Sequence, residues 1–235
     1  MRIVVTHLTR MRAPFICVAG LDIETGKDVR PVLESGQLGL SLLRRHGGPF
    51  DIAAIVDLGP VRYVGSAPET EDYRFERRKA RRVGAMAQPE LQERLQAAAC
   101  TALGDVFGDS LQRHGDTYAA DTGGGRASLG YVILAEPPLL LVNEHDKVRL
   151  RLRRAGHSAW LPVTDLRLYA YQDDQFIPRR DVVERLSGRM SSGARVILGV
   201  GLTRPMFGGG GVKRHWLQVN NIHIVDDPLW QENDN

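Results

Sequence analysis

Four cationic side chains alternate with apolar ones along residues 147–153, a spacing that suits the binding of phosphate groups. Successive side chains of a β-strand point to opposite faces, so the pattern places the apolar residues on one face and the cations on the other. The cations are Lys147, Arg149, Arg151 and Arg153. Like charges about 7 Å apart repel one another unless carboxylates, water or a polyanion offset them. The strand therefore predicts either a polyanion-binding face or a solvated face that acidic side chains neutralise.

A second basic segment combines cations with aromatic rings. Cations attract phosphates and aromatic rings stack on bases, which is how many proteins bind single-stranded nucleic acid. The residues of this segment are Tyr73, Arg74, Phe75, Arg77, Arg78, Lys79, Arg81 and Arg82. The alternative is a flexible charged loop that the neighbouring acidic residues 69–76 balance.

A glycine run at 208–211 leads into Lys213, Arg214 and Trp216. Backbone amides could approach a phosphate there while the side chains add charge and a stacking surface. No Gly-Lys-Ser/Thr follows at the spacing of a Walker loop. The alternative is a flexible hairpin connection.

Asn220 and Asn221 interrupt an otherwise apolar strand at 216–225. Buried amides need hydrogen-bond partners, so the pair either fixes a β-bulge or presents hydrogen bonds to a ligand.

Signals for catalysis are few. The seven histidines form no HExxH, the two cysteines are far apart, and neither a Gly-x-Ser-x-Gly elbow nor a Gly-x-Gly-x-x-Gly loop is present. We therefore predict no cofactor and no metal. The aspartates that could gather around Mg²⁺ are Asp51, Asp57, Asp226 and Asp227, but turn aspartates more often have structural roles.

The elements that position these residues belong to an ordinary globular chain. It has 235 residues, of which 43% are hydrophobic and 25% charged, with a net charge of +3, so disorder, collagen and coiled coil are excluded. No apolar run approaches the roughly 20 residues of a membrane span, and the N-terminus lacks a secretory signal. We expect a cytoplasmic protein without membrane contact, with Cys17 and Cys100 as reduced core thiols.

The order of elements predicts two small barrels. Strands are expected in the first third, with a short helix at 38–45, a strand at 50–57, a longer helix at 88–103 and a central loop at 115–125. The second half has strands at 139–142, 148–152, 159–163 and 166–171, a helix at 181–189 and strands at 194–202 and 216–225. Five strands with one helix before the last two is the element order of an OB barrel. We predict a mainly β protein with a few helices and two OB-like barrels, an N-terminal one at 1–120 with a helical insertion and a C-terminal one at 121–235.

The two ends of the chain share a short pattern. Residues 6–11 read Thr-His-Leu-Thr-Arg-Met and residues 201–206 read Gly-Leu-Thr-Arg-Pro-Met. The copies are not a tandem repeat, and we interpret them as a sign that the two ends meet in one site.

These blocks, with 17–22, 29–32 and the segment His-Trp-Leu-Gln-Val-Asn-Asn-Ile-His at 215–223, resemble the bacterial dual OB-fold domain proteins. The matching blocks lie at the two ends, and residues 65–135 offer nothing to align. The resemblance implies two OB barrels and, by analogy of fold, nucleic-acid binding in a genome-defence or mobile-element setting. It supplies no catalytic residues.

Three hypotheses follow for the function. The first is a non-enzymatic module that binds single-stranded or structured nucleic acid on the strand at 147–153, with Arg10, Arg30, Thr203 and Arg204 near a groove between the barrels. The second is an interaction subunit that binds a protein partner or a small anionic ligand such as a nucleotide. The third is a Mg²⁺-dependent enzyme that acts on nucleic acid.

Overall fold

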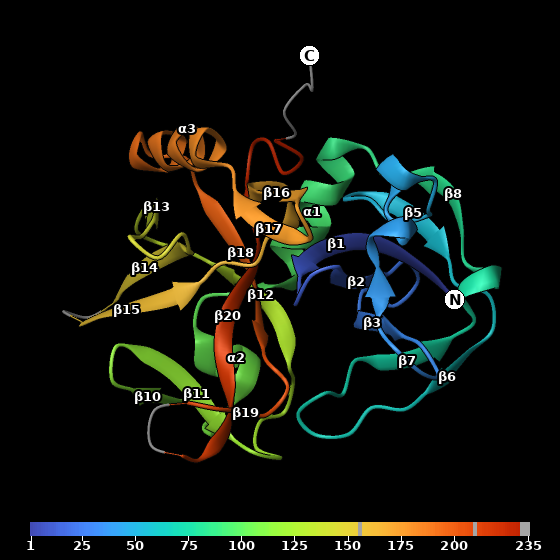
Figure 1. The fold of residues 1–235 in the computed structure, drawn as a ribbon, viewed down its shortest axis with the longest axis horizontal. Helices are drawn as coiled ribbons and strands as arrows, with labels where there is room; N and C mark the ends of the chain where they lie inside the picture. Colours follow the sequence, from blue (N-terminus) through green and yellow to red (C-terminus); the bar gives the residue numbers. More distant parts are fainter. Residues whose placement is uncertain (155–156, 209–210, 231–235) are drawn as a thin grey trace.

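The chain folds into two small β-barrels that lie side by side (Figure 1). The computed structural model describes residues 1–154, 157–208 and 211–230. As predicted, the structure is mainly β with a few helices, and the barrel strands dominate both halves.

The first barrel is a closed ring in which two short strands act as one bent strand. Its strands are β1 (Arg2–Arg10), β2 (Phe15–Asp22), β3 (Asp28–Val32), β5 (Ala54–Asp57), β6 (Val61–Tyr63) and β7 (Asp72–Phe75). β5 pairs with β1 and β6 pairs with β7, while a parallel pairing of β3 with β7 closes the ring. This arrangement is a five-stranded Greek-key barrel of the OB type. Outside the ring, β4 (Leu38–Gly39) pairs with β2, and β8 (Arg81–Ala85) pairs with β5.

The second barrel repeats this plan with a helix in the expected place. Its elements are β12 (Leu129–Ile133), β13 (Leu139–Val142), β14 (Val148–Arg154), β15 (His157–Pro162), α3 (Arg180–Ser191), β18 (Val196–Leu202) and β20 (Lys213–Ile224). β12 pairs with β18 and β13 pairs with β14, so β12 and β13 together form the first, bent strand. A parallel bridge from Val163 to Val219 joins the end of β15 to β20.

Smaller elements connect and extend the barrels. Between them lie α1 (Gln88–Ala98), β9 (Ala99–Cys100), α2 (Leu103–Phe107), β10 (Gln112–His114) and β11 (Thr117–Asp121). β16 (Tyr169–Gln172) and β17 (Gln175–Pro178) form a hairpin before α3, and β19 (Met206–Phe207) pairs with β20. Short 3₁₀ helices occupy Leu40–Leu42, Arg44–His46, Arg77–Lys79 and Leu166–Leu168.

Each barrel has its own apolar core, and the first core extends into the second half of the chain. Leu91 and Leu95 of α1 are fully buried in the first core. Tyr131 of β12 and Ile197 of β18 also belong to this core, although their strands form the second barrel. The two barrels therefore share apolar packing and not only polar contacts.

The hairpins β1–β2 and β18–β20 each contain one bulged residue. The pairing of β1 with β2 shifts between Val5 and His7, which leaves Thr6 as the extra residue. The pairing of β18 with β20 shifts where Asn221 and Val219 face consecutive residues of β18, which leaves Asn220 as the extra residue. A bulge bends its strand and redirects the bulged side chain.

Several predicted elements differ in the structure. Residues 38–46 form β4 and two 3₁₀ turns rather than one helix, because the backbone is extended at Leu43 between the two turns. The predicted strand at 50–57 is limited to β5, because Ala53 just before it takes a φ of 62°. Residues 166–171 begin as a 3₁₀ turn before β16.

The middle of the chain also differs. The helix predicted at 88–103 stops at Ala98, because β9 then pairs with β12. The loop predicted at 115–125 contains β11, which pairs with β20 and buries Ala119 and Ala120. Because β9, β10 and β11 all join the sheet of the second barrel, we propose a boundary near α1 rather than at residue 120.

Cys17 and Cys100 are both partly buried and form no disulfide. Burial raises the pKa of the Cys17 thiol, which keeps it protonated at neutral pH. None of the helices in the described part of the chain combines the length and the apolar character that a membrane crossing requires.

Candidate nucleic-acid interface

The cations of β14 lie on one face of the three-stranded sheet β13–β14–β15, as the alternation predicts. Val148 and Leu150 are almost completely buried in the second core. Arg149 and Arg151 are half-buried on the opposite face, and Arg153 is exposed. Lys147 is exposed in the turn before β14.

An aromatic ring stands directly beside these cations. Trp160 of β15 pairs with Arg151 across the sheet, and the Arg151 guanidinium lies 5.5 Å from the centre of the indole ring. Nη2 of Arg149 donates a hydrogen bond to the Trp160 carbonyl oxygen at 3.1 Å. Trp160 was not among the predicted site residues, although the alternation of 158–162 places it on the cationic face.

The outward-facing arginines of β14 are not paired with carboxylates. Within the residues that the structure describes, none of Arg149, Arg151 and Arg153 forms an ion pair with a carboxylate. Side chains of Leu139 and Leu141 from β13 flank them instead, opposite Arg151 and Arg149. This face is therefore a positively charged surface with an aromatic ring, and its three arginines form no ion pair within the described part of the chain.

The loop between β18 and β20 has a different arrangement from the predicted one. Nε1 of Trp216 donates to the Met206 carbonyl oxygen, and a Cβ on Gly208 would lie only 1.9 Å from the Trp216 ring. Trp216 thus anchors this hairpin from within. The exposed ring is Phe207, at 65% exposure, with the Lys213 ammonium 5.0 Å from its centre. Arg214 is engaged by Asp121 at 3.0 Å.

The β10–β11 hairpin contacts both the β13–β14–β15 sheet and the hairpin that contains Trp216. The Trp160 amide donates to the Asp116 carbonyl oxygen at 2.7 Å. The His114 ring lies 6.1 Å from the Trp216 ring. In Figure 1 the β13–β15 sheet, the β10–β11 hairpin and β19 follow one another along one side of the second barrel.

Carboxylates pair with three of the six cations of the second basic segment. Its ion pairs join Arg74 to Glu34, Lys79 to Glu76 and Arg81 to Asp57. Phe75 is buried against Phe50, and Tyr73 lies against Tyr63. Arg77 donates to the Ser41 hydroxyl, while Arg78 and Arg82 are exposed. The buried Phe75 ring has no free face for a base, so we leave this segment out of the interface.

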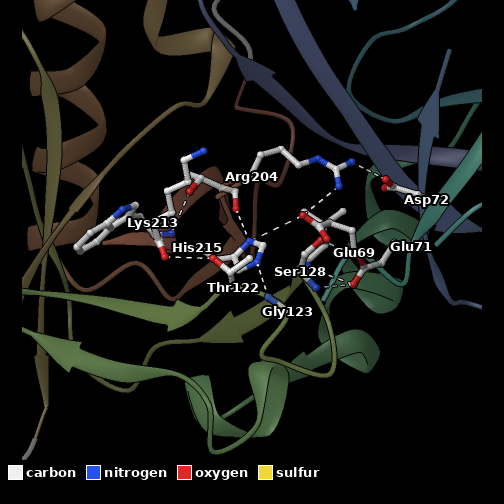
Figure 2. Close-up of polar contacts among 12 residues, drawn as sticks. Glu69, Glu71, Asp72, Thr122, Gly123, Ser128, Arg204, Lys213 and His215 are labelled. Carbon is white, nitrogen blue, oxygen red and sulfur yellow. Dashed lines mark hydrogen bonds and ion pairs between the residues drawn. The ribbon is translucent and has the colours of Figure 1, made fainter. Parts of the chain in front are cut away.

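A polar seam joins the two barrels, formed by Arg30, Glu69, Asp72, Arg204 and His215. Figure 2 shows the last four of these residues. Asp72 accepts from Nε of Arg30 at 2.5 Å and from Nη2 of Arg204 at 2.5 Å. Arg204 also pairs with Glu69 at 3.0 Å. The structure therefore brings Arg30 and Arg204 together, as predicted for a site between the barrels, but both guanidinium groups are engaged by carboxylates.

His215 and Glu71 extend the seam. Nδ1 of His215 lies 2.8 Å from the Thr203 carbonyl oxygen, and its Nε2 accepts from the Gly123 amide. Nδ1 therefore carries the proton, and the ring is neutral in this arrangement. The Glu71 carboxylate accepts from the amide and the hydroxyl of Ser128 at 2.8 and 2.9 Å. From the sequence, Glu69, Glu71 and Asp72 were expected only to balance the charge of the neighbouring basic segment.

Asn220 and Asn221 lie inside the molecule. Asn220 occupies the bulge, with Nδ2 3.4 Å from Nδ1 of His7. Oδ1 of Asn221 accepts from the Leu8 amide at 2.9 Å, which ties β20 to β1. Of the two alternatives for this pair, the bulge is the one that the structure contains.

The two Leu-Thr-Arg copies reach across the seam in opposite directions. Arg10 of the first barrel places its guanidinium 4.3 Å from the Tyr169 ring centre, and its amide donates to Thr164. Arg204 of the second barrel pairs with residues of the first. The two ends of the chain therefore meet, and the arginine of each copy contacts residues of the other barrel.

A family model described as dual OB-containing domain matches residues 1–222. The chain belongs to this family. Comparison with curated proteins finds no match. The family match covers residues 65–135 as well, where the sequence offered no motif to align.

In OB folds, oligonucleotides bind on the face of strands 2 and 3 and on the loops after strands 1 and 4. In the first barrel of this dual OB-containing domain, these positions contact the second barrel. Arg30 of its third strand is buried, and the loop after its fourth strand supplies Glu69 to Arg204. The corresponding positions of the second barrel are β14, β15 and the loop at 203–212, which carry the uncompensated arginines and the exposed Phe207.

The structure separates the aspartates of the Mg²⁺ hypothesis. Asp51 pairs with Arg44, Asp57 with Arg81 and Asp227 with Arg189, while the Asp226 carbonyl accepts from Gln88. Across 1–154, 157–208 and 211–230, no group of three or more His, Cys, Asp or Glu side chains is placed to hold a metal ion.

Proposed function

We propose that this OB-fold module binds single-stranded nucleic acid on the outer face of β14 and β15. The observation that carries the proposal is the row of Arg149, Arg151 and Arg153 beside Trp160, without carboxylate partners among the described residues. Phosphates would pair with the guanidinium groups, and a base would stack on the indole ring. Binding releases the counterions of the phosphates, which supplies most of the affinity at low salt.

The loop at 203–212 extends this surface. Lys213 and Phe207 present a cation and an exposed ring, the same pair of groups that β14 and β15 provide. Arg30 and Arg204 are assigned instead to the contact between the barrels, because Asp72 engages both. Arg10, Asn220 and Asn221 also contact the opposite barrel. Thr203 contacts His215 and Trp216 within the second barrel.

The experiment measures fluorescence anisotropy of labelled single-stranded DNA, single-stranded RNA and duplex DNA over a salt series. Replacing Arg149, Arg151 and Arg153 together by Ser should weaken single-strand binding. It should also reduce the slope of log K against log salt by about 2, since each lost phosphate contact contributes about 0.7 for single strands.

A matched control removes three arginines from the first barrel. Arg62, Arg74 and Arg81 all pair with Glu34 or Asp57, so replacing them by Ser should leave the slope nearly unchanged. Equal slopes for the two triple variants would contradict the proposal. Thermal unfolding of both variants checks that each is folded.

A protein partner is the second candidate. Met206, Phe207 and Val212 are exposed by 51%, 65% and 49%, which makes the tip of the β19–β20 hairpin an apolar projection of the kind that protein contacts use. Size-exclusion chromatography of the protein from cell extract, with and without nuclease, distinguishes the candidates. A complex that survives nuclease favours the protein partner.

A further inference from the structure

A small pocket opens beside the end of the arginine row. It has a volume of about 170 Å³ and lies where β11, β14, β15 and the connection between β12 and β13 meet. The residues that matter for its chemistry are Tyr118, Leu134, Glu136, Leu152 and Arg153. Mouths of β-barrels are common positions for ligand sites.

The size of the pocket limits what it can hold. Drug-sized ligands occupy pockets of roughly 300 Å³ or more, whereas an engineered apolar cavity of about 150 Å³ binds benzene. A pocket of about 170 Å³ therefore suits a single six-membered ring. Leu134 and Leu152 supply an apolar lining, and Tyr118 supplies an aromatic ring.

Arg153 connects the pocket to the proposed interface. It is the last of the outward-facing arginines of β14 and also lines the pocket. A strand that runs along Arg149 and Arg151 would bring its next phosphate to Arg153. The base of that nucleotide would then turn past the end of β14 to enter the pocket, because Leu152 and Ala159 line it from the opposite face of the sheet. Single-stranded nucleic acids are often recognised by bases that leave the stack and enter such sites.

Glu136 gives the pocket a preference among bases. It stands exposed at the rim, and the described part of the chain offers it no cationic partner. A carboxylate only accepts hydrogen bonds, so it can receive one from the N4 amine of cytosine, whereas the O4 of uracil or thymine would face it with a second acceptor.

We propose that this pocket receives one cytosine base of the strand bound on β14 and β15. The inference rests on the proposed function and adds a specificity to it: the arginine row binds any single strand, and the pocket favours cytosine at one position.

The test compares short oligodeoxycytidine with oligodeoxyuridine by fluorescence anisotropy at neutral pH. The wild-type protein should bind the cytidine strand roughly tenfold more tightly, the effect of one hydrogen bond to a charged acceptor. Glu136→Ala should abolish this ratio and leave uridine-strand affinity unchanged or higher. The matched control is Glu184→Ala, which removes an exposed carboxylate from α3 and should keep the ratio.

A second measurement places the base. Titration of the isotope-labelled protein with cytidine monophosphate, followed by amide chemical shifts, should perturb residues 132–136 and Tyr118. Equal binding of both strands with unshifted amides at these positions overturns the pocket and leaves the proposed function standing. Failure of the triple arginine variant to change binding overturns the proposed function, and absence of all strand binding overturns both.

Discussion

Asp72 is the residue on which the contact between the barrels most depends. Its side chain is 8% exposed and lies between the guanidinium groups of Arg30 and Arg204. A buried charge that loses its partner is far more costly than an exposed one, because water cannot replace the lost contact.

We predict that Asp72→Asn lowers the free energy of unfolding by about 3–5 kcal/mol, because it leaves the Arg30 guanidinium buried without a counter-charge. The matched control is Glu34→Gln, which removes a carboxylate that also serves two arginines but is 72% exposed. Its cost should stay below about 1 kcal/mol. Urea unfolding of both variants gives the comparison, and similar losses would contradict the role assigned to Asp72.

At the scale of single residues, the sequence predicted those placements that depend only on residues nearby in the chain. Alternation was sufficient to place Arg149, Arg151 and Arg153 on one face. It could not show that Asp72 lies against Arg204, because that contact spans 132 positions of sequence. Trp216 was predicted as a stacking surface, because the sequence does not show that Gly208 lies against its ring.

The bulged β18–β20 hairpin depends on glycines that leave room for polar side chains. A Cβ on Gly201 would lie 2.3 Å from Nδ2 of Asn220, and one on Gly199 would lie 2.8 Å from Nε2 of His7. These glycines allow the bulge residue and a buried histidine to pack against the strand.

We predict that Gly201→Ala destabilises the protein by about 1–3 kcal/mol through this overlap. Gly188→Ala is the control, for which we expect a change in stability of the opposite sign. Gly188 lies within α3 and a Cβ there meets nothing within 4 Å, so alanine should stabilise by about 0.5–1 kcal/mol. Thermal or urea unfolding measures both, and a neutral Gly201→Ala would show that the strand can yield without cost.

Among the elements, those with a strong local pattern were predicted well. The helix predicted at 181–189 is α3, and the strands predicted at 148–152 and 194–202 are β14 and β18, each from periodicity and turn residues. The strand β9 could not be predicted, because Ala99 and Cys100 extend a helical pattern and become a strand only through pairing with β12.

Two buried histidines make the fold sensitive to acid, and a buried aspartic acid offsets part of that effect. Burial lowers the pKa of His7 to about 3, helped by the proximity of His223, and burial likewise lowers the pKa of His223 to about 3. Burial and the charge of Glu71 raise the pKa of Asp28 to about 7. The unfolded chain would titrate these groups near 6.5 and 3.8.

Between about pH 4 and 6 the unfolded chain thus binds two more protons at the histidines and one fewer at Asp28. The net difference of one proton predicts that these groups lower stability by about 1.4 kcal/mol for each unit of falling pH. Urea unfolding over this range measures the slope. His223→Leu should remove the net difference and flatten the slope by the same amount, and an unchanged slope in this variant would contradict the prediction.

At the scale of the molecule, the two-barrel plan was predicted by element order and by the blocks at the two ends. The use of the first barrel's binding positions as a contact with the second was not predictable, because it depends on how the barrels face each other. That contact leaves the second barrel as the one with a free cationic face.

The contact between Asp72 and Arg204 also bears on how the chain is made. A ribosome that adds about 5–20 residues per second incorporates Asp72 roughly 7–26 s before it reaches Arg204, 132 positions later. During that interval Glu69 and Asp72 of the nascent first barrel lack their partner Arg204. The Leu8 amide likewise lacks its hydrogen-bond acceptor on Asn221. The contacts between the barrels can therefore form only after the last strands have been translated, and not when the first barrel closes.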